Sequence, residues 1–157
     1  MLTRIKNIWF LATQIPGLIF NPQLRRLFQE ARSFSKELPT RLKKPLPELM
    51  KQITSEASLS IETQNEESLR KTADLATLLD RSSPLGLCLR RSLTRYYFLR
   101  KARMPVEINF GARFLDGKPD RELTGHAWIT LNGVPYYEAD ENWKDFTVML
   151  TYPAKTS

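Results

Sequence analysis

The stretch GLCLRRSLTRYYFLRKA, from Gly86 to Ala102, places the only cysteine of the chain at the start of a predicted helix. Apolar and aromatic residues recur at helical spacing over 87–103, and Pro105 ends the pattern. One side of this helix is therefore expected to face a core. The other side is expected to face solvent and holds most of the charge of the stretch: Arg90, Arg91, Arg95, Arg100, Lys101 and Arg103.

Downstream of this helix, the sequence predicts an antiparallel sheet. VEINFGARF at 106–114 alternates apolar residues on one face, as a half-buried strand does. HAWITL at 126–131 and VPYYEAD at 134–140 flank Asn132-Gly133, a dipeptide typical of two-residue hairpin turns. DFTVMLTY at 145–152 is predicted to be the last strand.

Upstream, residues 1–80 show apolar residues at helical spacing, and prolines at positions 16, 22, 39, 45 and 47 are expected to cut this region into short helices. Asn21 and Pro22 predict the start of one of them, as N-cap and first helical residue. Helices, then a central helix, then strands predict an α+β fold. We divide it into a helical N-terminal region at 1–81 and a core at 82–157.

The 157 residues have a net charge of +7 and a hydrophobic content of 41%, as expected of a globular chain. Nine Lys or Arg against three Glu place +6 of that charge in residues 1–50. Such a basic arm suits an acidic partner, a nucleic acid or an anionic membrane surface. The apolar run at 8–20 is too short to span a bilayer and has no signal-peptide cleavage motif. We expect it to pack on protein, with membrane-surface contact by residues 1–20 as the alternative.

One cysteine excludes an intrachain disulfide and, with one histidine, leaves too few ligands for a structural zinc site. We therefore predict a cytoplasmic protein without a metal or another cofactor. A single Cys on a helix and a single His on a following strand are instead the types of residue that form a thiol nucleophile and its base.

Cys88 lies in the first turn of the predicted helix, where free backbone N–H groups and the positive end of the helix dipole favour the thiolate. His126 begins the first predicted hairpin strand, and a third group is needed to orient its ring. A turn at 132–133 places His126 opposite position 139, which two acids flank, Glu138 and Asp140. Spacing selects these two acids and does not choose between them.

Three separated motifs within residues 82–152, about half of the chain, resemble a known family, the transglutaminase-like cysteine proteases that remove leaders in lasso-peptide maturation, relatives of the microcin-processing protease. The motifs are Cys88-Leu89 with Ser92-Leu93 and Leu99-Arg100, then Gly111, then His126-Ala127-Trp128 with Gly133 and Glu138. The resemblance implies a papain-like or transglutaminase-like core, in which the central helix with the cysteine packs on an antiparallel sheet.

The resemblance also implies roles for individual residues. Cys88 is the nucleophile, His126 the base, and Glu138 the orienting acid at a position where the family usually has Asp, with Asp140 as the alternative. The implied substrate is a precursor peptide with a leader, and the implied partners are a separate leader-recognition protein and a cyclase. The backbone N–H of Cys88 is expected to help hold the oxyanion. Trp128 is expected either to wall the cleft or to pack in the core.

Two alternatives stay open at this point. The same three residues would serve amide or acyl transfer to an amine instead of hydrolysis. A non-catalytic protein would instead use the basic arm and the arginine-rich helix to bind a partner or a nucleic acid, with Tyr96, Tyr97 and Trp9 as stacking groups. These aromatic residues fall on the apolar sides of their helices, which favours core packing, so we predict no nucleic-acid binding.

Overall fold

The computed structural model describes residues 20–59, 65–114, 122–138 and 141–154. Within these ranges the fold is α+β, as predicted, with four α-helices and a four-stranded antiparallel sheet in the order β3-β2-β1-β4. Residues 1–19 and Asp140 lie outside the described residues, and with them the expected membrane contact and the alternative acid. The elements are α2 (Pro22–Arg41), α3 (Leu46–Leu59), α4 (Glu66–Leu79), α5 (Leu87–Lys101), β1 (Val106–Phe114), β2 (Leu123–Leu131), β3 (Val134–Pro135), the 3-10 helix η2 (Glu141–Asp145) and β4 (Thr147–Tyr152).

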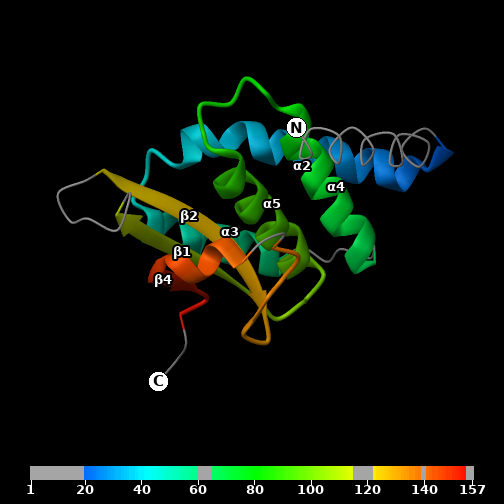
Figure 1. Ribbon diagram of the computed structural model, residues 1–157. Helices are drawn as coiled ribbons and strands as arrows, with labels where there is room; N and C mark the ends of the chain where they lie inside the picture. The colour runs from blue at the N-terminus through cyan, green and yellow to red at the C-terminus, as the bar shows by residue number, and fades with distance from the viewer. Residues whose placement is uncertain (1–19, 60–64, 115–121, 139–140, 155–157) are drawn as a thin grey trace.

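Helix α5 is the central element of the fold, as the sequence predicted. It contacts α2, α3 and α4 on one side and β1 and β2 on the other (Figure 1). Leu93, Tyr96 and Leu99 on this helix are completely buried, and they form one core with apolar residues of α2, α3 and the sheet. The helix with Cys88 is therefore held on both sides by packed side chains, which fixes its first turn in space.

Helix α2 begins where the sequence predicted but is longer than expected. Asn21 caps α2, because its side-chain oxygen accepts hydrogen bonds from the N–H groups of Gln23 and Leu24. Pro39 does not break this helix, and that expectation was wrong. It lies in the last turn of α2, where it removes one backbone hydrogen bond, and the helix ends two residues later at Arg41.

The expectation that the basic residues of 90–103 face solvent holds for Arg103 but was wrong for Arg90, Arg95 and Lys101, which are buried. The Arg95 side chain is 3% exposed and forms a paired contact with Asp74 of α4, with Nε–Oδ1 and Nη2–Oδ2 distances of 2.6 and 2.7 Å. Arg90 is buried and donates to the backbone oxygens of Thr77 and Asp80 at the end of α4. A buried guanidinium needs a fixed anion or several carbonyl acceptors, and α4 supplies both. The arginine-rich helix is therefore mostly an internal element.

The register of the sheet confirms the predicted turn, since Leu131 pairs with Val134. The second strand of the hairpin is shorter than expected, however. β3 ends at Pro135, and Tyr137 has a φ of 50°, which turns the chain out of the ladder. Glu138 therefore does not follow the alternation of side chains along a strand. The register of the sheet alone does not determine the side to which it points.

Candidate active site

Cys88 lies in the first turn of α5, which docks on the open edge of β2. β2 pairs with β3 only at Thr130 and Leu131, so the backbone of Ala127 faces α5 instead of a strand. The hydroxyl of Ser92 donates to the Ala127 carbonyl at 2.8 Å, and the backbone of Ala127 also lowers the pKa of the Cys88 thiol. Ser92 and Cys88 are one helical turn apart on α5, so both side chains lie on the same side of the helix.

The sulfur of Cys88 is surrounded by donors. A hydrogen bond from His126 lowers the pKa of the thiol most, and the N–H groups of Ala127 and Leu89 lower it further, whereas partial burial of the sulfur raises it. The net pKa lies below the ordinary value of 9.0. Helix α5 begins at an N-cap, Gly86, that has no side chain to occupy the free N–H groups of the first turn. This arrangement favours the thiolate, which is the nucleophilic form.

His126 lies on β2 opposite Gly111 of β1. The strand starts three residues earlier than predicted, at Leu123. Its imidazole stacks on Trp128 with centroids 5.7 Å apart and an angle of 17°, and it contacts the ring of Phe146 at 5.2 Å. Trp128 is itself 2% exposed, so it packs in the interior and also walls the imidazole. Gly111 makes this packing feasible, because a Cβ there would lie 2.9 Å from both aromatic side chains.

Glu138 lies on the other side of the imidazole. Its Oε2 is 3.7 Å from Nε2 of His126, and its side chain is 6% exposed. At this separation the contact is an ion pair rather than a short hydrogen bond. Interaction with Cys88 first, and then with the Glu138 carboxylate, raises the pKa of His126 to about 9, against the effect of burial. Because Nε2 faces the carboxylate, Nδ1 is the nitrogen available to the sulfur. His126 is therefore mostly protonated at neutral pH and lies beside a thiol whose pKa is lowered.

Two arginines of α5 complete the surroundings of this carboxylate. Nη2 of Arg91 lies 3.5 Å from Oε2 of Glu138, and Nη1 of Arg95 lies 4.0 Å from Oε1. Both positions were expected to face solvent, so sequence reasoning missed them. A signal was available in Asp74, an acid in the middle of the apolar pattern of α4, since a buried carboxylate requires a cation.

Side chains of α4 contact the segment before Glu138 and hold it in place. The hydroxyl of Tyr136 donates to Oε1 of Glu66 at 2.7 Å, and the guanidinium of Arg70 lies 3.9 Å from the ring centre of Tyr137. Nη1 of Arg95 also donates to the Tyr137 carbonyl at 3.4 Å. The carboxylate therefore has a fixed position although it follows a two-residue strand, because side chains replace the missing ladder.

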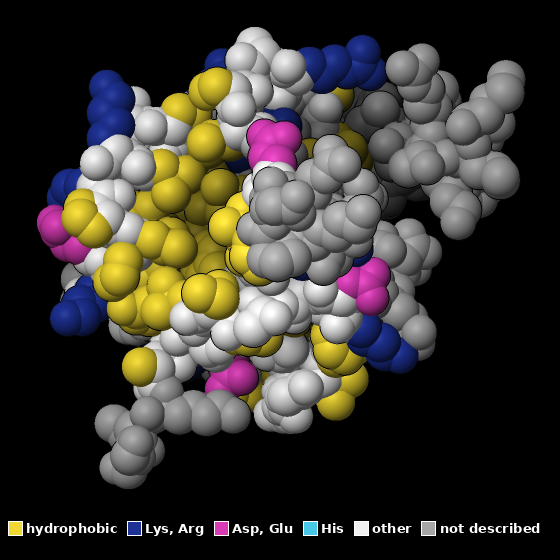
Figure 2. Space-filling model, turned by 60° about the vertical axis from the view of Figure 1, so that its left-hand side comes forward, with side chains coloured by type: hydrophobic (Ala, Val, Ile, Leu, Met, Phe, Trp, Pro, Cys, Tyr) yellow, Lys and Arg dark blue, Asp and Glu magenta, His cyan; other side chains and the backbone are white. Residues whose placement is uncertain are grey.

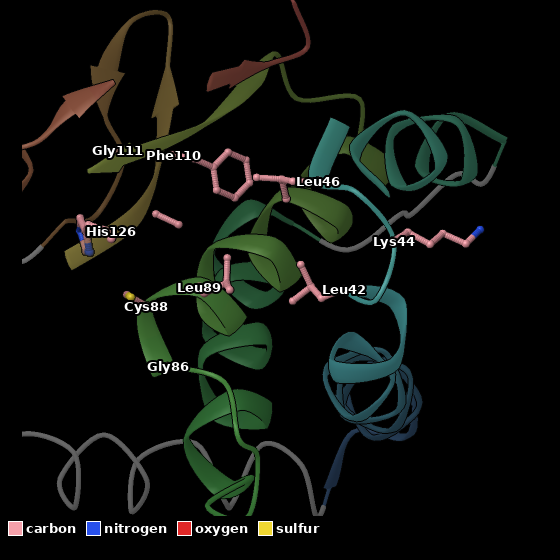
Figure 3. A pocket seen from close by; sticks show the side chains of 11 residues that line it. Leu42, Lys44, Leu46, Gly86, Cys88, Leu89, Phe110, Gly111 and His126 are labelled. Carbon is pink, nitrogen blue, oxygen red and sulfur yellow. The ribbon is translucent and has the colours of Figure 1, made fainter. Parts of the chain in front are cut away.

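A cavity of about 420 Å³ opens beside the sulfur. Cys88 and His126 lie at one end of it, and residues of the turn between α2 and α3 form the other end (Figure 3). Its walls are mostly apolar: Leu42, Leu46, Leu89, Phe110 and Ala127. The site thus combines a nucleophilic sulfur, a proton donor and a concave apolar surface, the arrangement needed to hold an acyl group and attack its carbonyl.

Among the described residues, no cluster of three or more His, Cys, Asp or Glu side chains is arranged to hold a metal ion. The helices in this same part of the chain are all too short or too polar to cross a membrane. Comparison with protein families gives a match to the model described as the transglutaminase-like superfamily, over residues 38–151. Neither the curated proteins nor the solved structures include a match to this chain. The family match begins within α2, so it includes helices upstream of residue 82 as well as the sheet.

Proposed function

The chain belongs to the transglutaminase-like superfamily, and on that premise we propose that it is a cysteine peptidase that removes the leader from a ribosomally made precursor peptide in lasso-peptide-type maturation. The superfamily match supports cysteine-protease or acyl-transferase chemistry. The finer assignment depends on the motifs around Cys88, Gly111 and His126. The observation that supports it most is the contact of one sulfur, one imidazole and one carboxylate on three different elements.

The proposed mechanism uses these groups in a fixed order. The thiolate of Cys88 attacks the peptide carbonyl at the end of the leader and forms a C–S bond. Free N–H groups of the first turn of α5 stabilise the oxyanion. The imidazolium of His126 gives its proton to the leaving amine as the C–N bond breaks, which leaves a thioester on the leader. His126 then takes a proton from water, and the resulting hydroxide attacks the thioester. The C–S bond breaks, the leader leaves with a new carboxyl group, and Cys88 and His126 are again thiolate and imidazolium.

Glu138 is proposed as the orienting acid. It faces Nε2 and holds the ring so that the other nitrogen points to the sulfur. Glu138 is among the described residues and Asp140 is not, and titration of the His126 ring in Glu138→Gln and Asp140→Asn distinguishes the two. The division of the chain at residues 81 and 82 stays a prediction. So do the separate leader-recognition protein and the cyclase as partners, and docking of one of them on the basic N-terminal arm.

The test is to incubate wild type and Cys88→Ala with the precursor peptide encoded beside the gene, with and without the partner proteins, and to follow products by mass spectrometry. We expect wild type to release a leader with a free carboxylate and Cys88→Ala to release none. A parallel reaction contains a primary amine at high concentration. Amine adducts on an uncut precursor would refute the peptidase and support acyl transfer, while no product of either kind from wild type with all partners present would refute both.

A further inference from the structure

The cavity beside Cys88 is built from residues that no catalytic role requires. Leu42 comes from the turn after α2, Leu46 from the first position of α3, Leu89 from α5 and Phe110 from β1. All four are partly buried and pack against the main core on one side. On their other side they face the cavity that contains the sulfur. Hydrophobic side chains also gather around a hollow on the face of the molecule shown in Figure 2.

The chemistry of this cavity selects its occupant. Besides the catalytic pair, Lys44 is the charged residue among those that line the cavity. Its side chain extends away from Cys88 (Figure 3) and is paired with Glu48 and Gln52. The surface beside the sulfur is therefore apolar and uncharged. A volume of about 420 Å³ lies at the low end of the range for ligand pockets, which gives room for one or two side chains rather than for a folded domain.

We propose that this cavity is a specificity pocket that binds an apolar side chain next to the reacting carbonyl of the peptide substrate. The proposal rests on the proposed function in one respect, that Cys88 is the nucleophile. Because the cavity and the sulfur are continuous, an apolar side chain buried there would hold the neighbouring carbonyl within reach of the thiolate. The turn between α2 and α3 would then contribute to substrate choice, although it lies more than forty residues before Cys88.

The test uses the single cysteine of the chain, so that every adduct reports on Cys88. Second-order rates of alkylation are measured with N-methyl and N-butyl iodoacetamide at pH 7 and divided by the rates of the same reagents with glutathione. Each buried methylene favours binding about fourfold. The three additional methylenes of the butyl group then give a corrected butyl-to-methyl ratio of about eightfold for half burial and about 60-fold for full burial.

Leu42→Gln and Leu46→Gln place a polar group in the wall without adding charge. Each is expected to reduce the ratio at least about threefold while the rate with the methyl reagent stays unchanged. The matched control is Met149→Gln, an exposed apolar residue of β4 outside the cavity, which is expected to keep the wild-type ratio. Thermal unfolding shows which of the two wall variants is folded, and either one suffices.

A wild-type ratio within twofold of one would overturn the pocket, and so would an equal fall of the ratio in the Met149→Gln control. Failure of the proposed function has a different signature. In that case N-methyl iodoacetamide itself would react with wild type no faster than with an ordinary thiol, whereas the butyl-to-methyl ratio would still decide whether the pocket exists.

Discussion

The pairing of Glu138 with His126 makes a quantitative prediction, because the chain has a single histidine. Two unit charges 3.7 Å apart interact by about 4.5 kcal/mol at an effective dielectric constant of about 20. This is an upper bound, since Arg91 and Arg95 share the same carboxylate at 3.5 and 4.0 Å. We expect Glu138→Gln to lower the pKa of His126 from about 9 by about one unit, equivalent to about 1.4 kcal/mol.

The assay is an NMR titration of the imidazole Cε1–H, which gives one resonance in this chain. Cys88→Ala is expected to lower the midpoint more than Glu138→Gln does, because the hydrogen bond with Cys88 is the larger cause of the raised pKa. Asp140→Asn and Glu107→Gln serve as controls and are expected to leave the midpoint unchanged. A midpoint that stays within about 0.3 pH units of wild type in Glu138→Gln, or that falls in Asp140→Asn, would refute the assignment of Glu138.

The raised pKa of His126 also makes the free energy of unfolding depend on pH. The folded pKa of His126, about 9, exceeds its ordinary value of 6.5. Protonation of the ring therefore stabilises the fold fully below pH 6.5, and this contribution is lost as the pH rises through about 9. In urea unfolding, the difference between wild type and Glu138→Gln is thus expected to be largest near pH 6 and to shrink above pH 9. A difference that is constant with pH would show that the carboxylate does not interact with the ring.

Three further substitutions test the frame around the site. Gly111→Ala places a Cβ 2.9 Å from two aromatic side chains and is expected to destabilise the fold by about 1–3 kcal/mol in urea unfolding; an unchanged midpoint would contradict this packing. Arg95→Met removes the two short contacts of the buried Asp74 carboxylate and leaves it with Arg70 at 3.6 Å; it is expected to cost about 3–5 kcal/mol, whereas the double variant with Asp74→Leu recovers most of the loss; additive losses would argue against the pair. Ser92→Ala leaves the Ala127 carbonyl without its donor and is expected to cost about 1–3 kcal/mol and to raise the pH at which the thiol ionises, as measured by thiolate absorbance near 240 nm. A stable variant with an unshifted absorbance curve would show that docking of α5 on β2 does not depend on this bond.

Much of the fold followed from local signals. The cap at Asn21, the helix with Cys88 and the turn that pairs Leu131 with Val134 each depend on a few neighbouring residues, so the sequence predicted them. The position of Glu138 did not follow, because it depends on a backbone turn at Tyr137 that no spacing rule foresees. Side-chain contacts with α4, far away in the sequence, stabilise that turn.

The largest error was the prediction that the arginines of α5 face solvent, and this error has a physical cause. Apolar periodicity assigns a charged residue to solvent, which holds when the charge has no buried partner. Arg95 and Arg90 are buried because Asp74 and the carbonyl groups at the end of α4 lie opposite them. Such pairs depend on which helices meet, and the apolar periodicity of one helix does not report that.

The three groups at the site are supplied by α5, by β2 and by the segment after β3, and none of them is close to another along the chain. Before these elements have assembled, the sulfur at position 88 is an ordinary thiol, mostly protonated at neutral pH. Its nucleophilicity is thus a property of the completed tertiary structure. In copies that have not folded, the thiol would have only the modest reactivity of an ordinary cysteine, so a fast reaction at Cys88 would itself report a completed fold.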